Sequence, residues 1–248
     1  MNDRPADPEH DHTAQSPRGK AILALALLVP APTLGILAAL WVPGLAETAP
    51  GKAIFLCAKL WLVAFPLVWT KWVERKPLTI PRPSWRGMGW AVGTGVAIFA
   101  IIAAAYYGYA KDQIDNAAMA QRMQDAGLKT PLYLLLGAIY WCTVNSLIEE
   151  YVWRWFVFEK CKAVTPKMTL LPILASGLFF TLHHFLAMLA YLPGQLHLVL
   201  LASLGVFIGG ATWSWLYLKS KNIYAAYISH VFADIIIFYI AYQIAFGG

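Results

Sequence analysis

Two adjacent carboxylates, Glu149 and Glu150, lie in the stretch SLIEEYVWRWFVFEK, within one of the most apolar parts of the chain. Arg154 follows four residues after Glu150. An ionisable side chain near the middle of a bilayer costs about 2.5–3.5 kcal/mol on insertion scales, so such residues are usually retained for a function. A carboxylate can act as a general base, and an arginine four residues along a helix can pair with one of the two. This stretch is therefore the first candidate for chemistry.

Two later segments also place ionisable side chains among apolar residues. The stretch ASGLFFTLHHFLAM contains His183 and His184, and YISHVFADIIIFY contains His230 and Asp234. His230 and Asp234 are four residues apart, so they share one face of a helix. The cost of polar groups in hydrocarbon is lowest when they face one another. We expect three helices to present Glu149, His184 and His230 to one water-accessible cavity near mid-membrane.

The elements that must hold these residues are membrane-spanning helices. The chain has 248 residues, of which 59% are hydrophobic and 13% charged, and its mean hydropathy is +0.57. Soluble domains contain about 25% charged residues. Windows of about 20 mostly apolar residues, long enough to cross a bilayer, recur seven times. The predicted fold is an all-α polytopic bundle with spans at 21–41, 54–73, 88–110, 131–158, 169–191, 195–218 and 222–246.

The net charge of +6 reflects membrane topology rather than nucleic-acid binding. Thirteen of the 19 Lys and Arg residues fall before the first span or in the loops that follow spans two, four and six. This asymmetry predicts a multi-pass cell-membrane protein with a cytoplasmic N-terminus and an external C-terminus. The expected partners are membrane lipid and a membrane-associated protein or peptide substrate, with no nucleic acid.

The sequence indicates one membrane domain, 21–248, after a polar tail, 1–20, that we expect to be disordered. The polar segment 111–130 is expected to extend the third span outside the membrane. Lys59 is expected to reach toward the outer face along its long stem. Gly205 and Gly209 form a GxxxG pair that favours close helix packing. A group of aromatic side chains is expected to face lipid or the interface: Trp153, Trp155, Phe156 and Phe158.

Three motifs in the last 120 residues identify a family resemblance. EEYVWR fits E-E-x-x-x-R, FTLHH fits F-x-x-x-H from Phe180 to His184, and HVFAD fits H-x-x-x-N/D. In this order, and on separate spans, they resemble the CAAX protease and bacteriocin-processing family of intramembrane endopeptidases, which includes the type II CAAX prenyl endopeptidase. The resemblance covers about 131–246, the expected catalytic part.

The resemblance implies a role for each matching residue. Glu149 would activate a water together with His184, and the water would attack the scissile carbonyl. His230 and Asp234 would lie beside the developing oxyanion. Glu150 and Arg154 would support the site as an ion pair. The chain departs from the family pattern in having Asp rather than Asn at 234.

The second histidine also fits the pattern in another register. Phe179 and His183 form F-x-x-x-H as well, so the sequence leaves open which histidine is catalytic. Neighbouring helical positions diverge by about 100°, so we expect one helix not to aim both at the same point. A packed or hydrogen-bonded role is favoured for His183.

Other functions remain open on the same residues. No cofactor is expected for a Glu/His-activated water, but one Glu and two His could hold Zn²⁺ with an open fourth position. HExxH is absent from the sequence, so the common zincin pattern does not apply. A rhomboid-like serine protease would leave Glu149 unused. The cluster could also serve a transporter as a proton relay, and a non-catalytic immunity protein is the third alternative.

Overall fold

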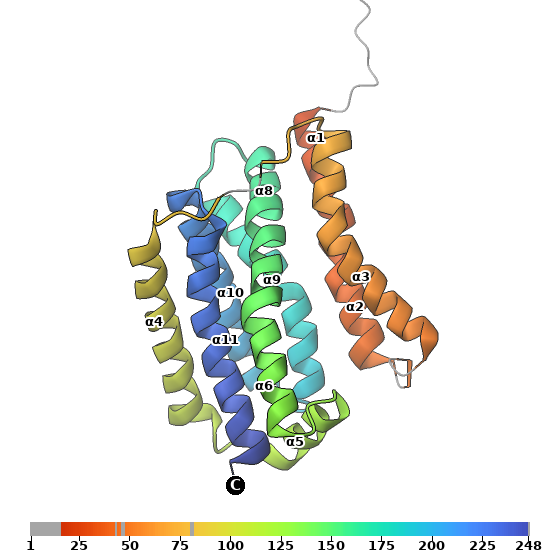
Figure 1. Ribbon diagram of the computed structural model, residues 1–248, viewed down its shortest axis with the longest axis vertical. Helices are drawn as coiled ribbons and strands as arrows, with labels where there is room; N and C mark the ends of the chain where they lie inside the picture. The colour runs from red at the N-terminus through yellow and green to blue at the C-terminus, as the bar shows by residue number, and fades with distance from the viewer. Residues whose placement is uncertain (1–15, 43, 46–47, 80–81, 248) are drawn as a thin grey trace, which may run out of the picture.

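Seven long apolar helices form the architecture, as the sequence predicts. The computed structural model describes residues 16–42, 44–45, 48–79 and 82–247, and these contain helices and loops but no strand. Seven helical segments within them are long and apolar enough to cross a membrane: Pro17–Trp41, Ala49–Val73, Met88–Ala110, Pro131–Val164, Leu170–Tyr191, Leu196–Ser220 and Ile223–Phe246. Because their number is odd, the two ends of the described chain lie at opposite ends of the bundle (Figure 1).

The first two spans form a helical hairpin at one side of the bundle (Figure 1). The first consists of α1 (Pro17–Leu28), α2 (Pro30–Ile36) and the π-helical turn η1 (Leu37–Trp41). The second consists of α3 (Ala49–Val68) and η3 (Trp69–Val73). Ser16 caps α1 by accepting a hydrogen bond from the Gly19 amide at 3.1 Å. Residues 17–20, which were predicted to belong to the disordered tail, form the start of α1 instead. Residues 1–15 of that tail lie outside the described part of the chain.

The third span, α4 (Met88–Ala105) with η4 (Tyr106–Ala110), packs along α11 on the other side of the bundle (Figure 1). The polar segment after it does not continue this helix, contrary to expectation. The chain turns at 111–115, and a separate helix, α5, runs over Asn116–Asp125. Asp115 accepts a hydrogen bond from the Ala118 amide at 3.0 Å, so its side chain starts the new helix.

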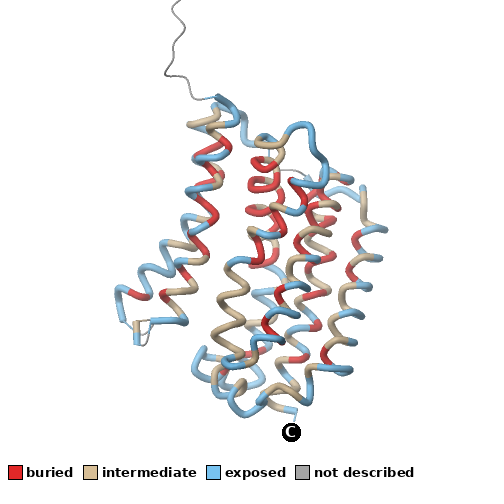
Figure 2. The backbone as a smooth tube through the Cα atoms, turned by 180° about the vertical axis from the view of Figure 1, so that it is seen from behind, coloured by how far each residue is buried: buried red, intermediate tan, exposed pale blue. Residues whose placement is uncertain are grey.

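The fourth span alternates between α-helical and wider π-helical turns. It runs through α6 (Pro131–Tyr140), η5 (Trp141–Asn145), α7 (Ser146–Glu150), η6 (Tyr151–Phe158) and α8 (Glu159–Val164). Figure 2 shows that burial is concentrated in its second half. The expectation of lipid-facing aromatics is wrong for Trp153, Phe156 and Phe158, each 1% exposed, because this half packs inside the bundle.

The last three spans are α9 (Leu170–Tyr191), α10 (Leu196–Ser220) and α11 (Ile223–Phe246). Helices α9 and α10 approach each other closely at Gly177 and Gly210, where a Cβ on Gly210 would lie 3.2 Å from the Gly177 Cα. The predicted GxxxG contact is wrong, because a Cβ on Gly205 would meet no described atom within 4 Å, and the three atoms nearest to one on Gly209 all belong to Trp213 of its own helix.

Candidate active site

The adjacent glutamates of α7 have different surroundings. The Glu150 side chain is fully buried, whereas the Glu149 side chain is 18% exposed. Successive residues of a helix point about 100° apart, so one carboxylate can face the helix-packed interior while the other faces a more open space. The two glutamates are therefore not equivalent, as the sequence predicts.

Glu150 joins a buried ion pair with Arg154. Arg154 Nη1 lies 3.1 Å from Glu150 Oε1, and both side chains are completely buried. Arg154 Nη2 also donates to the Gly210 carbonyl at 3.2 Å, at the glycine contact between α9 and α10. The guanidinium lies over the rings of Phe180 and Trp213, at 4.9 and 5.1 Å from their centroids. Arg154 thus connects the fourth span to the two helices behind it.

His230 of α11 lies against both glutamates. Its Nδ1 is 2.8 Å from Glu150 Oε1, so a proton on Nδ1 is donated to that carboxylate. Its Nε2 then faces Glu149 Oε2 and Asp234 Oδ1, each at 3.7 Å. The Trp213 ring stacks on the imidazole with centroids 3.8 Å apart. The orientation of His230 is therefore fixed from two sides.

Asp234 is held by a hydroxyl from the fourth span. Ser146 donates a hydrogen bond to Asp234 Oδ2, and this contact joins α7 to α11. Ser146 is fully buried, and its pairing with Asp234 is not evident from sequence because 88 residues separate them. In this arrangement Asp234 accepts a hydrogen bond with one oxygen and faces His230 with the other.

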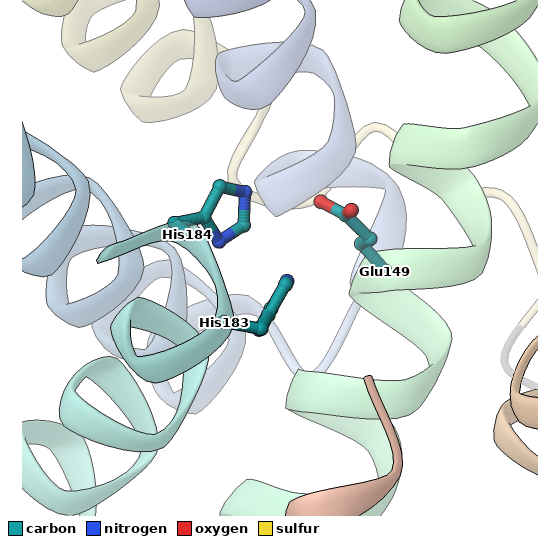
Figure 3. A group of neighbouring side chains, drawn as sticks. All are labelled: Glu149, His183 and His184. Carbon is teal, nitrogen blue, oxygen red and sulfur yellow. The ribbon is translucent and has the colours of Figure 1, made fainter. Parts of the chain in front are cut away.

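His183 and His184 both approach Glu149, contrary to expectation. The three residues offer donor atoms that all lie within 4.8 Å of one another, and Figure 3 shows the histidines on α9 directed toward Glu149 on the fourth span. The two imidazole centroids are 4.2 Å apart. Neighbouring backbone positions diverge, but each side chain is long enough to swing back toward the same space.

The two histidines nevertheless have different partners. His184 Nδ1 lies 2.9 Å from the Phe180 carbonyl. A carbonyl can only accept, so Nδ1 carries the proton, and Nε2 of the neutral ring is left with a free lone pair. His183 stacks on Trp153 at 5.5 Å with the ring planes 8° apart, and its buried Nδ1 has no hydrogen-bond partner in the described part of the chain. His183 is thus packed, as predicted, but it also lies in the group formed with Glu149 and His184.

Glu149 has a hydrogen-bond partner that the sequence analysis missed. Asn145 Nδ2 donates to Glu149 Oε1 at 2.8 Å, and Lys59 Nζ donates to Asn145 Oδ1 at 3.0 Å. Asn145 precedes Glu149 by four residues, so helical spacing could have revealed that pair. The outward reach predicted for Lys59 is wrong, because its ammonium lies at the site instead.

An apolar groove runs between α6 and α11 beside the cluster. Its volume is about 610 Å³. On the fourth span it reaches Cys142 and Thr143, just before Asn145, and on α11 it begins at Ile235, next to Asp234. The groove therefore offers apolar surface that ends close to the cluster of polar residues.

The arrangement is suited to activating a water. A partly exposed carboxylate faces imidazole nitrogens, and a second, buried carboxylate fixes one imidazole and an arginine. Such a set can take a proton from a water and return one to a leaving group. The same Glu149, His183 and His184 atoms are also of the types that bind Zn²⁺.

Comparison with known proteins agrees with the motifs. Residues 130–236 match a family described as Rce1-like, type II CAAX prenyl endopeptidase Rce1-like. No curated protein and no solved structure matches the chain significantly. The matched segment contains Glu149, Glu150, Arg154, His183, His184, His230 and Asp234. The family indicated by the motifs is confirmed over this segment, and it supports a membrane hydrolase of the CAAX protease type.

Proposed function

Starting from the Rce1-like family of residues 130–236, we propose that the protein is an intramembrane endopeptidase in which Glu149 and His184 activate the attacking water. The observation that carries this proposal is the contrast between the two glutamates. Glu150 is buried and contacts Arg154 and His230, whereas Glu149 is partly exposed and faces the imidazoles of α9. Of these two glutamates, Glu149 is therefore the one that can act as a base on a water molecule.

The proton transfers follow from the tautomers. Glu149 takes a proton from water, and the resulting hydroxide attacks the scissile carbonyl to form a tetrahedral intermediate. His184, with its Nδ1 proton held by the Phe180 carbonyl, presents Nε2 as a second acceptor beside Glu149. The proton then passes to the leaving amine nitrogen as the C–N bond breaks, since a general base returns its proton as a general acid.

His230 and Asp234 are assigned to the oxyanion side of the reaction. Glu150 holds Nδ1 of His230, so Nε2 is the nitrogen that remains for the substrate. When Nε2 carries a proton, it is a positioned donor for the negative oxygen of the tetrahedral intermediate. Asp234, with one oxygen on Ser146, orients this imidazole rather than donating in place of the family's Asn.

The substrate is proposed to carry an apolar chain next to the cleaved bond. The family description names CAAX prenyl endopeptidases, and we extend that substrate class to this chain as part of the proposal. The groove between α6 and α11 offers about 610 Å³ of mostly aliphatic and aromatic lining that ends near Asp234. A prenyl chain in this groove would place the adjoining peptide bond beside the cluster.

Single-turnover cleavage of a prenylated peptide tests the mechanism. We expect Glu149→Gln to fold and bind substrate like the wild type, with cleavage slower by at least about 10²-fold, because the variant keeps the shape but removes the base. Glu159→Gln is the matched control, since Glu159 lies on the same span but pairs with Lys162 away from the site. Wild-type cleavage by Glu149→Gln would refute the proposal. Proton flux in liposomes without cleavage would favour the transport relay instead.

A zinc-dependent protease is the second candidate, favoured by the grouping of Glu149, His183 and His184. Direct water activation predicts full activity without stoichiometric metal. We therefore expect elemental analysis of active protein to find far less than one Zn per chain, and chelation to leave cleavage unchanged. About one Zn per active chain, lost with activity on chelation and restored by Zn²⁺, would support the metalloprotease instead.

A further inference from the structure

Lys59 is a cation placed at the site by a helix outside the family match. It lies within α3, 71 positions before the matched segment begins at residue 130. A lysine within a membrane span is costly unless it is paired or reaches the interface. Among the described residues, Lys59 forms no salt bridge, and its ammonium hydrogen-bonds to an amide instead. An ion pair therefore does not explain why a lysine is found at this position in a membrane span.

The hydrogen bonds from Lys59 run in one direction. The ammonium has only donors, so the atom of Asn145 that faces it at 3.0 Å must be the carbonyl oxygen. The amide nitrogen of Asn145 then points the other way and donates to Glu149 Oε1 at 2.8 Å. Lys59 thus determines which end of the Asn145 amide faces the glutamate. Reversal of the amide would place two acceptors, Oδ1 and the carboxylate, against each other.

This chain of contacts also selects one oxygen of Glu149. Oε1 is occupied by Asn145, while Oε2 is the oxygen that lies 3.7 Å from His230 Nε2. A cation bound to the amide oxygen polarises the amide and strengthens the hydrogen bond that its nitrogen donates. The stronger hydrogen bond holds the carboxylate in the orientation that a base needs.

We propose that Lys59 is a positioning residue, which acts through Asn145 to orient the general base Glu149. The inference rests on the proposed function of Glu149. It assigns a role in the reaction to α3, on which no family motif falls. Asn145, which is 5% exposed, is the rigid connection between the two.

The test compares kcat and KM of Lys59 variants with prenylated peptide as substrate. We expect Lys59→Met to lower kcat about tenfold with little change in KM, because the base is less well positioned while the contacts to substrate stay the same. Lys59→Arg restores a donor cation and should recover most of kcat. Lys52→Met, at an exposed position of the same helix, is the matched control and should be unchanged. Methionine suits a membrane span, and melting temperatures verify that each variant is folded.

A double variant shows whether the effect passes through Asn145. Asn145→Ala alone should lower kcat to a similar degree, and Lys59→Met should add little in that background, since residues of one network are not additive. Equal loss from Lys59→Met with and without Asn145, or a wild-type kcat in Lys59→Met, would overturn the inference. Glu149→Gln is measured in parallel. If that variant cleaves normally, the proposed function itself fails, whatever the lysine does.

Discussion

Glu149 and Glu150 are the same side chain in two environments one residue apart. Glu150 has no exposed surface and faces Arg154 and His230, so its charge is balanced within the protein. Glu149 keeps 18% of its side chain exposed and lies beside the paired histidines of α9. A buried carboxylate with partners stabilises a particular packing, whereas an accessible one can exchange protons with water or substrate. The difference is set by helix geometry rather than by residue type.

Glu150→Gln should destabilise the protein without removing the base. The variant leaves the fully buried Arg154 guanidinium without a counter-charge, and breaking a buried pair in this way costs about 3 kcal/mol or more. We expect a lower melting temperature in detergent and partial loss of cleavage, because His230 also loses an ionised partner. A folded and wholly inactive Glu150→Gln, with active Glu149→Gln, would reverse the two roles.

Contacts between residues of one helix could be predicted from their spacing in the sequence, but contacts between helices could not. The Glu150–Arg154 and Phe180–His184 pairs follow from four-residue spacing, and both are present. The contacts of Asn145 with Lys59 and of Asp234 with Ser146 join residues 86 and 88 positions apart, and nothing in the periodicity specifies them. The convergence of His183 and His184 depends on side-chain length, which a count of degrees per residue ignores.

At the scale of elements, glycine sets the contact between α9 and α10. The two helices meet where Gly177 and Gly210 face each other, and the Gly210 carbonyl is close enough to receive Arg154. Glycine was the right residue type to expect at this contact, but Gly205 and Gly209 are not the glycines that form it. In membranes, small residues permit close helix approach, but the sequence does not reveal which of several glycines lies at the contact.

Gly177→Ala and Gly205→Ala should therefore have opposite outcomes. A Cβ on Gly177 would lie 3.0 Å from the Ala211 amide nitrogen and 3.1 Å from the Phe207 carbonyl oxygen, both backbone atoms. Overpacking of this kind costs about 1–3 kcal/mol. Gly205 has open space around it, so alanine there should leave stability unchanged or raise it by up to about 1 kcal/mol through helix propensity. Melting temperatures of the two variants measure the difference, and equal values would contradict the assigned contact.

Trp153, Phe156 and Phe158 were expected to face lipid or the interface because aromatic residues are common there, yet they pack inside the bundle. Segment η6 follows Glu150 directly and contains Trp153 and Phe156, both 1% exposed. Wider turns change the number of residues per turn, so a face read at 3.6 residues per turn does not continue through them. The seven spans were predictable because length and hydropathy do not depend on the number of residues per turn. Which side chains of η6 point into the bundle does depend on it.

On the scale of the whole molecule, the chain is a multi-pass membrane protein whose two described ends lie at opposite ends of the bundle (Figure 1). The excess of Lys and Arg on one side predicts that the N-terminus and the 71–87 loop are cytoplasmic. We expect reporter fusions to place Gly248 outside and the loop inside. Fusions that report both on the same side would contradict the seven-span topology.

The hydrogen bond between Lys59 and Asn145 also affects the order of events during synthesis of the chain. Synthesis proceeds from the N-terminus, and 86 residues separate the lysine from its acceptor. At about 5–20 residues per second, Asn145 follows about 4–17 s after Lys59. During that interval the Lys59 ammonium lacks the acceptor that it has in the folded protein. Synthesis of the second span thus precedes the contact that accommodates its charge, because that hydrogen bond forms only after the fourth span has been made.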